Sequence, residues 1–200
     1  MKAMWDERYG EPALAYGSSA NEFLRTMAHH LPTGPVLCLA EGQGRNAVFL
    51  ARQGHPVTAV DQSAIGLACA RELAVQQGVH IDTCTADLGD FVIAPESWAG
   101  IIAIFAHLPA TLRANVHRAV VAGLRPGGVL ILEAYTPDQL NHRTGGPRDP
   151  DLLMALGVLR EELAGLELIH ALETTRDIHE GRYHTGIGAV VQVVGRKPGT

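Results

Sequence analysis

The 200-residue sequence has few of the features that mark secreted, metal-binding or membrane proteins. Its three cysteines, Cys38, Cys69 and Cys84, form no Cys-x-x-Cys pair and are odd in number, so we expect neither a disulfide framework nor a metal site. The first residues, 1–6, lack the apolar core of a signal peptide. The longest apolar runs, such as 99–106, are far shorter than the ~20 residues of a membrane helix. These absences predict a soluble, cytoplasmic protein.

Clustered positive charge is also missing. The formal net charge is −5, and the basic residues are scattered. Three arginines that we assign to one helix, Arg113, Arg118 and Arg125, have no matching basic stripe elsewhere and are interpreted as a solvent-exposed face. Because phosphate binding normally needs a Lys/Arg face, we expect no nucleic-acid partner.

Short apolar segments alternate with helical patterns over the first two thirds of the chain. The expected strands are 36–40, 56–60, 81–86, 98–105 and 129–135, and the expected helices are 46–53, 64–77 and 111–124. Ser63 is the predicted N-cap of the second of these helices. Such alternation predicts an α/β fold built on a parallel sheet with right-handed crossovers.

The last third of the chain has a different pattern. A loop at 137–150 and a helix at 151–163 precede two further strands, 166–178 and 187–196. Their link is too short to hold a crossover helix, so these strands should form an antiparallel hairpin at the sheet edge. Without internal repeats or a linker, residues 1–200 are expected to form one domain, with 1–30 as an N-terminal lid or helix.

A glycine-rich turn follows the first expected strand. Gly42 and Gly44 stand where open α/β sheets bind ligands, beyond the carboxyl end of a strand. Glycine allows positive φ and close backbone approach, and the amides that open the next helix favour anions. Asp61 and Asp87 end the next two strands. Asp61 could accept hydrogen bonds from the hydroxyls of a ribose, and Asp87 could accept one from an exocyclic amine.

The same turn also fits a dinucleotide-binding pattern. Gly42 to Ala47 matches G-x-G-x-x-[GA], and Asp61 follows at the expected spacing of about 20 residues. An NAD-dependent oxidoreductase is therefore the alternative. The chain has no room for a separate substrate domain, however, and none of its tyrosines has a lysine four residues later.

Four motifs in order resemble the class I S-adenosylmethionine-dependent methyltransferases. They are Val36–Asn46, Thr58–Asp61, Ala86–Leu88 and Leu124–Gly128. The resemblance implies a Rossmann-like seven-stranded sheet ordered 3-2-1-4-5-7-6, with strand 7 antiparallel and helices on both faces. It also implies S-adenosylmethionine as cofactor and S-adenosylhomocysteine as product.

The opening segment is similar to the small-molecule branch around the tellurite-resistance and thiopurine methyltransferases. That similarity implies that the N-terminal segment covers the cofactor as a lid. The predicted cofactor-binding residues are Trp5, Arg8, Tyr9, Tyr16, Glu41, Gly42, Gly44, Arg45, Asn46, Asp61, Gln62, Ser63, Asp87, Leu88, Phe105 and His107.

Two residues depart from the family pattern. Family members usually carry aspartate at the position of Cys38 and glycine at that of Ala40. A carboxylate is normally needed nearby to meet the cationic amine of the cofactor's methionine part. Our hypothesis is that Glu41 supplies it.

The methyl group of the cofactor is already activated. The task of the protein is therefore to position a nucleophile in a site from which water is excluded. If the acceptor needs a base, His107 is the leading candidate, because it follows the fourth strand at the ligand end of the sheet. Tyr135 and Glu133 end the fifth strand beside it, and Tyr135 is the second predicted catalytic residue. The loop with His142, Arg143, Gly145 and Gly146 could close over the substrate, and His184 is a weaker candidate.

Residues 105–108 do not form the Asn/Asp-Pro-Pro-Tyr motif. That motif resembles the one in enzymes that methylate amino groups of DNA bases or of protein glutamine. Together with the acidic net charge, this favours a small-molecule acceptor: a thiol, chalcogen oxyanion, phenol or amine. A non-catalytic protein that binds S-adenosylmethionine stays open as a further alternative. Both a monomer and a homodimer are compatible with the sequence.

Overall fold

Seven strands form one mixed sheet. The structure, a computed structural model, describes residues 2–11 and 14–199, so residues 1, 12–13 and 200 of the predicted domain and N-terminal lid lie outside the described residues. The strands are β1 (Val36–Leu39), β2 (Val57–Asp61), β3 (Asp82–Thr85), β4 (Trp98–Ile104), β5 (Leu124–Tyr135), β6 (Glu167–Glu180) and β7 (His184–Arg196). Their order is β3-β2-β1-β4-β5-β7-β6, and β7 runs antiparallel to both neighbours. The predicted fold class and strand order are confirmed.

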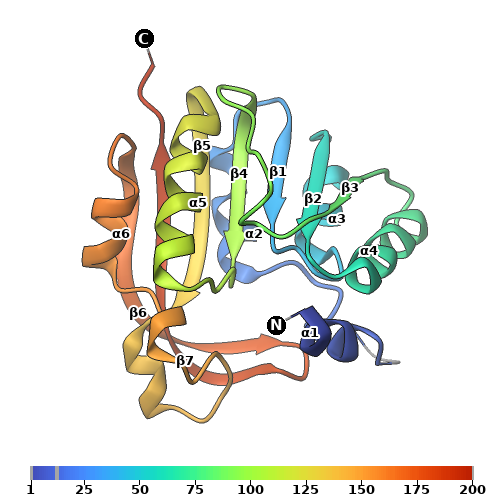
Figure 1. The fold of residues 1–200 in the computed structure, drawn as a ribbon. Coiled ribbons are helices and arrows are strands. Elements are labelled where there is room, and N and C mark those ends of the chain that lie inside the picture. Colours follow the sequence, from blue (N-terminus) through green and yellow to red (C-terminus); the bar gives the residue numbers. More distant parts are fainter. Residues whose placement is uncertain (1, 12–13, 200) are drawn as a thin grey trace.

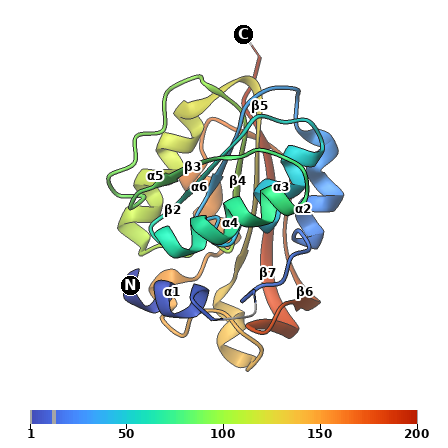
Figure 2. The same cartoon turned by 90° about the vertical axis from the view of Figure 1, so that its right-hand side faces the viewer.

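Helices cover both faces of the sheet (Figures 1 and 2). They are α1 (Lys2–Tyr9), α2 (Glu22–Met27), α3 (Arg45–Arg52), α4 (Ala64–Gln76), α5 (Ala110–Gly123) and α6 (Leu156–Glu162), with short 3-10 turns at Ala28–His30, Pro137–Asn141 and Pro150–Leu152. Apolar residues of α2, α3 and α4 pack on one face, and those of α5 and α6 pack on the other. The buried strand residues between them, such as Val36 and Leu37, explain why β1 is apolar throughout.

Several element ends follow from identifiable local interactions. Ser63 caps α4, as predicted, because its hydroxyl accepts a hydrogen bond from the Gly66 amide at 3.1 Å. The predicted hairpin is present and longer than expected, since β6 and β7 pair from Glu167 with Arg196 to Glu180 with His184. The connection from β3 to β4 contains no helix.

The helix predicted at 151–163 is shorter in the structure. Residues 153–155 separate the 3-10 turn from α6, and two of their backbone groups bond to neighbouring elements. The Met154 amide donates to the Tyr135 carbonyl at 3.0 Å, and the Leu153 carbonyl accepts from Arg113 at 3.3 Å. These bonds tie the chain to the end of β5 and delay the helix to Leu156.

The solvent-exposed face predicted for the three arginines is wrong for Arg113. That side chain is 4% exposed, and its guanidinium donates to Glu162 of α6 at 3.0 Å. His117 contacts the same carboxylate at 2.7 Å. Arg125 is not helical, because it belongs to β5. The buried Arg113–Glu162 pair therefore fastens α6 to α5.

Three segments far apart in sequence gather beyond the carboxyl ends of the parallel strands. These are α1, the segment between β5 and α6, and the turn of the β6–β7 hairpin, all at the lower edge of Figure 1. This is the edge at which open α/β sheets bind ligands. Among the described residues, no helix combines the length and apolar character needed to cross a membrane.

Candidate functional site

The turn between β1 and α3 has the backbone geometry that the glycines predicted. Gly42 and Gly44 have φ of 61° and 87°, and Ala40 also takes a left-handed φ of 50°. A Cβ on Gly44 would lie 2.5 Å from the Cβ of Ala70, so only glycine lets α3 begin this close to α4. The turn is thus shaped by close packing as well as by positive φ.

Asp61 closes this turn from the end of β2. Its two carboxylate oxygens accept hydrogen bonds from the Gly42 amide at 2.9 Å and the Ser63 amide at 2.8 Å. Burial raises the pKa of the carboxyl, while these amide bonds act against the rise. Each oxygen retains a lone pair after these bonds, so Asp61 can still accept two hydroxyl donors of a ribose.

Glu41 points its carboxyl at the start of α3. Its Oε1 accepts from the amides of Asn46 and Ala47 at 2.9 and 2.8 Å. Burial raises the pKa of Glu41 to about 7, although the two amide bonds and the charge of Arg45 act in the opposite direction. At neutral pH this carboxyl is therefore close to half-protonated. Only its ionised form could pair with a cationic amine, which is its predicted role.

The third acidic position is more open. Asp87 is exposed, and its Oδ1 accepts from the Gly89 amide at 2.8 Å. Leu88 beside it packs partly buried against the apolar layer under α5. Gln62, between Asp61 and Ser63, is partly exposed. The predicted residues at the ends of β2 and β3 therefore share the edge of the sheet that holds the glycine turn.

The N-terminal helix lies directly on the glycine turn. A Cβ on Gly42 would lie 2.5 Å from the Tyr9 hydroxyl, and one on Gly66 would lie 2.8 Å from the Tyr9 ring. Trp5 stacks on Tyr9 with ring centroids 5.5 Å apart. The Ser63 hydroxyl donates to Asp6 at 2.5 Å. In this conformation, α1 covers the surface beside Asp61 on which a nucleoside would rest.

A second part of the N-terminal segment connects to the hairpin. Arg8 donates to the Tyr16 hydroxyl at 2.8 Å, and its guanidinium lies 4.3 Å from the centroid of the Tyr183 ring. Tyr16 in turn packs on His184, with centroids 4.5 Å apart. The four predicted lid residues therefore divide between the glycine turn, which Trp5 and Tyr9 cover, and the hairpin, which Arg8 and Tyr16 contact.

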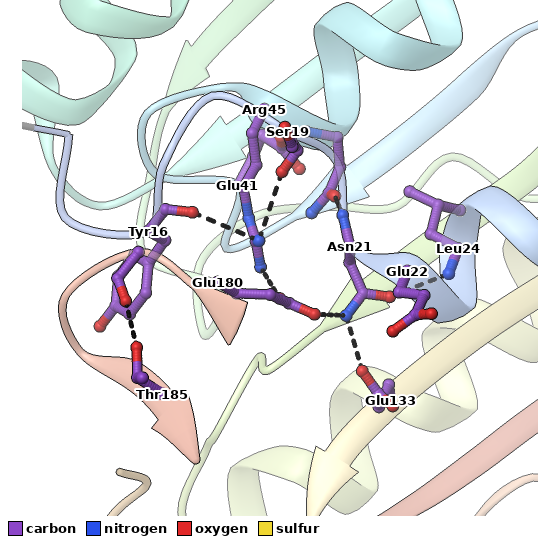
Figure 3. Close-up of polar contacts among 12 residues, drawn as sticks. Tyr16, Ser19, Asn21, Glu22, Leu24, Glu41, Arg45, Glu133, Glu180 and Thr185 are labelled. Atoms are coloured by element: carbon purple, nitrogen blue, oxygen red, sulfur yellow. Dashed lines mark hydrogen bonds and ion pairs between the residues drawn. The ribbon is translucent and has the colours of Figure 1, made fainter. Parts of the chain in front are cut away.

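Beneath the segment lies a buried network of charges. Figure 3 shows the part of it formed by Asn21, Arg45, Glu133 and Glu180. Glu133, fully buried, accepts from Asn21 at 2.6 Å and from Arg176 at 2.7 Å. Glu180 accepts from Asn21 at 2.9 Å, Arg45 at 2.6 Å and Arg176 at 2.8 Å. Burial would raise the pKa of Glu180, but the arginines outweigh it and hold this pKa below its usual value. The network binds the N-terminal segment, α3, β5 and β6 together.

This network also occupies two residues predicted to bind the cofactor. Arg45 is bound to Glu180 and donates to the carbonyls of Tyr16 and Ser19 at 3.4 and 3.5 Å. The Asn46 side chain accepts from the Asn21 amide at 2.9 Å. Both side chains hold the protein's own segments in place.

At the ends of β4 and β5, four rings pack together. Phe105 lies 4.7 Å from Tyr135 and 4.4 Å from His184, measured between ring centroids. His107 stacks on Tyr135 at 5.7 Å. Phe105 has a φ of 52°, which is uncommon for a bulky residue. We call Phe105, His107, Tyr135 and His184 the aromatic cluster.

Within the cluster, His107 has both ring nitrogens directed at backbone groups. Nδ1 donates to the Leu152 carbonyl at 2.7 Å, which leaves Nε2 as an acceptor facing the Tyr135 amide at 3.5 Å. Burial lowers the pKa of His107 to about 4. The ring is thus a neutral link between β5 and the segment before α6, and this geometry does not favour a role as base.

Only part of this site could be named from the sequence. His184 was a weak candidate there, and Asn21, Arg176 and Glu180 were not singled out. These residues lie far apart along the chain and belong to no motif. Only the hairpin brings them to the sheet edge, so the one available signal was the predicted hairpin itself. Among the described residues, no group of three or more His, Cys, Asp or Glu side chains is arranged to hold a metal ion.

Residues 36–128 match the family model of a methyltransferase domain. This segment contains the glycine turn, Asp61, Asp87 and the Pro126–Gly128 turn. A search of curated proteins by sequence found no match.

Several solved structures have the same fold. One, described for the conversion of a disulfide bond into a thioacetal group during echinomycin biosynthesis, has a TM-score of 0.79, is 19% identical, and is matched over 99% of this chain and 92% of its own. TehB from Haemophilus influenzae has a TM-score of 0.72 at 19% identity, over 98% of this chain and 66% of its own.

N-methyltransferase NodS from Bradyrhizobium japonicum WM9, in complex with S-adenosylhomocysteine, has a TM-score of 0.72 at 15% identity, over 98% of both chains. All three structures are less than 25% identical to this chain, and they show that it shares their fold. The segment that matches the family model, 36–128, contains all four motifs on which the resemblance was based.

Proposed function

We propose that the protein transfers a methyl group from S-adenosylmethionine to a small-molecule acceptor. The observation that carries the proposal is Asp61, a buried carboxylate that closes the glycine turn and keeps two lone pairs free beside it. A dinucleotide could use the same carboxylate. The methyltransferase domain match over 36–128 favours S-adenosylmethionine.

The residues around the turn fit the proposed cofactor in distinct ways. Asp61 would accept the ribose hydroxyls, and the region of Asp87 and Leu88 would border the adenine. Glu41 lies on the side of the turn where the methionine part would extend. The bound cofactor supplies a methyl group already activated by its sulfonium. Tyr9 lies on Gly42 in this conformation, so entry of the cofactor requires α1 to shift.

The part of the site away from the glycine turn, at the ends of β4 and β5, suits a small acceptor. The aromatic cluster stands at the ends of β4 and β5, covered by the N-terminal segment and by the loop around Gly145. Such a covered, apolar site excludes water from a methyl transfer. It gives no surface along which a polymer could lie.

Within this site we assign His107 a positioning role. Its two nitrogens engage Leu152 and Tyr135 and so fix the end of β5. Tyr135 remains a proposed acceptor-contacting residue, since its ring belongs to the cluster and its hydroxyl is free of protein partners among the described residues.

Calorimetry with S-adenosylmethionine and with NAD tests the cofactor. We expect binding of the first only, and a loss of about tenfold or more in affinity for Asp61→Asn, because bonds to a charged acceptor are worth about 1.5–3 kcal/mol. Asp90→Asn, an exposed change on the same edge, is the matched control. Binding of NAD in place of S-adenosylmethionine would overturn the proposal.

Formation of S-adenosylhomocysteine tests the reaction. The acceptor panel contains thiols, phenols, amines and chalcogen oxyanions, each at the same concentration. Turnover with any of them supports the proposed enzyme. Tight binding of the cofactor without product for the whole panel, and for larger acceptors, would indicate a non-catalytic binding protein instead.

A further inference from the structure

Two polar atoms of the aromatic cluster are buried without a hydrogen-bond partner among the described residues. They are the hydroxyl of Tyr135 and Nδ1 of His184. Tyr135 is 0% exposed and His184 is 8% exposed. The two rings meet edge to face, with centroids 5.4 Å apart and planes at 89°. Buried polar groups are nearly always paired, so two unpaired ones side by side point to a ligand.

The pair is surrounded by aromatic rings, and a glycine faces it. Phe105 lies against both rings, and Tyr16 lies against His184 at 4.5 Å. Gly145 faces the pair from the loop above, since a Cβ there would lie 3.2 Å from the Tyr135 hydroxyl and 3.5 Å from His184 Cδ2. A planar ring is the shape that such faces and edges accommodate.

The charges near the pair are largely engaged with one another. Glu133 and Glu180 are bound to Arg45 and Arg176. Arg8 lies over the Tyr183 ring and donates to Tyr16. None of these groups reaches the free nitrogen or hydroxyl, so the pair offers one hydroxyl donor and one imidazole nitrogen. Burial lowers the pKa of His184 to about 3, so the ring is neutral at physiological pH. In the tautomer protonated at Nε2, its unpaired Nδ1 can accept a hydrogen bond.

We propose that Tyr135 and His184 bind the hydroxyl or thiol of an aromatic methyl acceptor. The proposal rests on the function proposed above and narrows its acceptor to phenols and aromatic thiols. The Tyr135 hydroxyl donates to the acceptor oxygen or sulfur, and the acceptor's own O–H or S–H donates to His184 Nδ1. Tyr16 and Phe105 enclose the acceptor ring.

The proton balance follows from this arrangement. The acceptor atom forms its bond to the methyl carbon while the carbon–sulfur bond of the sulfonium breaks and leaves its electron pair on sulfur. The acceptor's proton becomes strongly acidic as the new bond to the methyl carbon forms. It then leaves along its hydrogen bond to His184 Nδ1 and is released to solvent. A chalcogen oxyanion is disfavoured, because such an ion needs several donors and the pair supplies a single hydroxyl.

Binding of phenol tests the proposal independently of turnover. Phenol, anisole and tellurite are titrated by NMR and fluorescence against protein saturated with S-adenosylhomocysteine. Phenol should bind the unaltered protein, anisole should bind several-fold more weakly, and tellurite should not compete. Tyr135→Phe and His184→Leu should each weaken phenol binding about tenfold, the value of one net hydrogen bond.

Matched controls separate this role from a structural one. Tyr183→Phe and His179→Gln alter the same residue types outside the pair and should leave phenol binding unchanged. Tyr135→Phe removes a hydroxyl without a protein partner, so its melting temperature should not fall. A failure of His184→Leu to fold would leave Tyr135→Phe as the deciding variant.

The outcomes are distinct. Absence of phenol binding, equal binding of phenol by Tyr135→Phe, or competition by tellurite would each overturn the proposal. Calorimetry of S-adenosylhomocysteine on the same samples addresses the proposed function separately. If that ligand does not bind, the methyltransferase proposal fails, and phenol binding then decides whether the pair binds aromatic hydroxyl compounds for another purpose.

Discussion

Replacing Glu41 by glutamine should stabilise the protein at pH 8 and change its stability little at pH 5. The carboxyl is 9% exposed, and burial raises its pKa from 4.5 to about 7. Both amide bonds go to one oxygen, Oε1, from Asn46 and Ala47. A protonated carboxyl can accept both bonds in this way, and the glutamine amide has the same shape and an oxygen in the same place.

The sign follows from the direction in which the pKa moves. The folded state holds the Glu41 proton up to about pH 7, whereas the unfolded chain releases it near pH 4.5. Stability from this group is therefore complete below about pH 4.5 and is lost as the pH rises through 7. Between pH 5 and pH 8 the loss amounts to roughly 2–3 kcal/mol, because a tenfold difference in proton affinity between the two states is worth about 1.4 kcal/mol.

Urea unfolding at pH 5, 6, 7 and 8 measures this difference. Glu41→Gln should remove the decrease in stability that comes from ionisation of Glu41. The unfolding free energy of this variant should therefore exceed that of the unaltered protein by a growing margin as the pH rises. Glu72→Gln, an exposed carboxylate of α4, serves as the control. Asp61 is present in every sample, so its own raised pKa cancels in the comparison. Parallel pH curves for the unaltered protein and Glu41→Gln would refute the reasoning.

The same variant addresses the cofactor. If Glu41 meets the cationic amine of S-adenosylmethionine, binding of that cation should favour the ionised carboxylate, and affinity should increase from pH 6 to pH 8. Glu41→Gln should weaken binding and flatten this dependence. Unaltered affinity in Glu41→Gln would exclude Glu41 as the amine's partner without affecting the stability argument.

Three further substitutions test other parts of the structure. Gly44→Ala should destabilise the fold by about 2 kcal/mol or more and abolish S-adenosylmethionine binding, measured by thermal unfolding and calorimetry, because its Cβ would lie 2.5 Å from that of Ala70. Arg176→Met should cost about 3–5 kcal/mol in urea unfolding, because it leaves the buried Glu133 carboxylate without its cationic partner; a loss below about 1 kcal/mol would show that the network adds little. His107→Gln should lower stability by about 1–3 kcal/mol while turnover changes less than tenfold; a loss of about 100-fold in turnover with an altered pH–rate profile would restore this histidine as the base.

The fold was predictable wherever local patterns determine it. The apolar β1 followed by glycine predicted the first βα unit, Ser63 predicted the start of α4, and the short link after β6 predicted the hairpin. The strand order came from the family resemblance, because periodicity says nothing about which strands are neighbours. The start of α6 was not predictable, since residues 153–155 are held by bonds to Tyr135 and Arg113 that no local pattern shows.

The site divides in the same way. Asp61 was predictable, because one strand and one turn fix its place next to Gly42. The charge network was not, because Asn21 and Glu180 are brought together by the whole sheet. The pairing of Tyr135 with His184 depends likewise on the register of the hairpin with β5. Residues of opposite chain ends meet in a site only through such long-range contacts, which a motif search does not detect.

The departures from the family pattern at Cys38 and Ala40 become coherent when they are considered with Glu41. Cys38 is fully buried in β1, and burial, together with the nearby charge of Glu41, raises the pKa of its thiol. The aspartate usual in the family at this position would place a second carboxylate against Glu41, and two such charges in one buried site cannot both ionise readily. Glu41, three residues later, is bonded to the amides of Asn46 and Ala47 at the start of α3. Ala40 takes a left-handed φ of 50°, the backbone region that favours the glycine usual in the family.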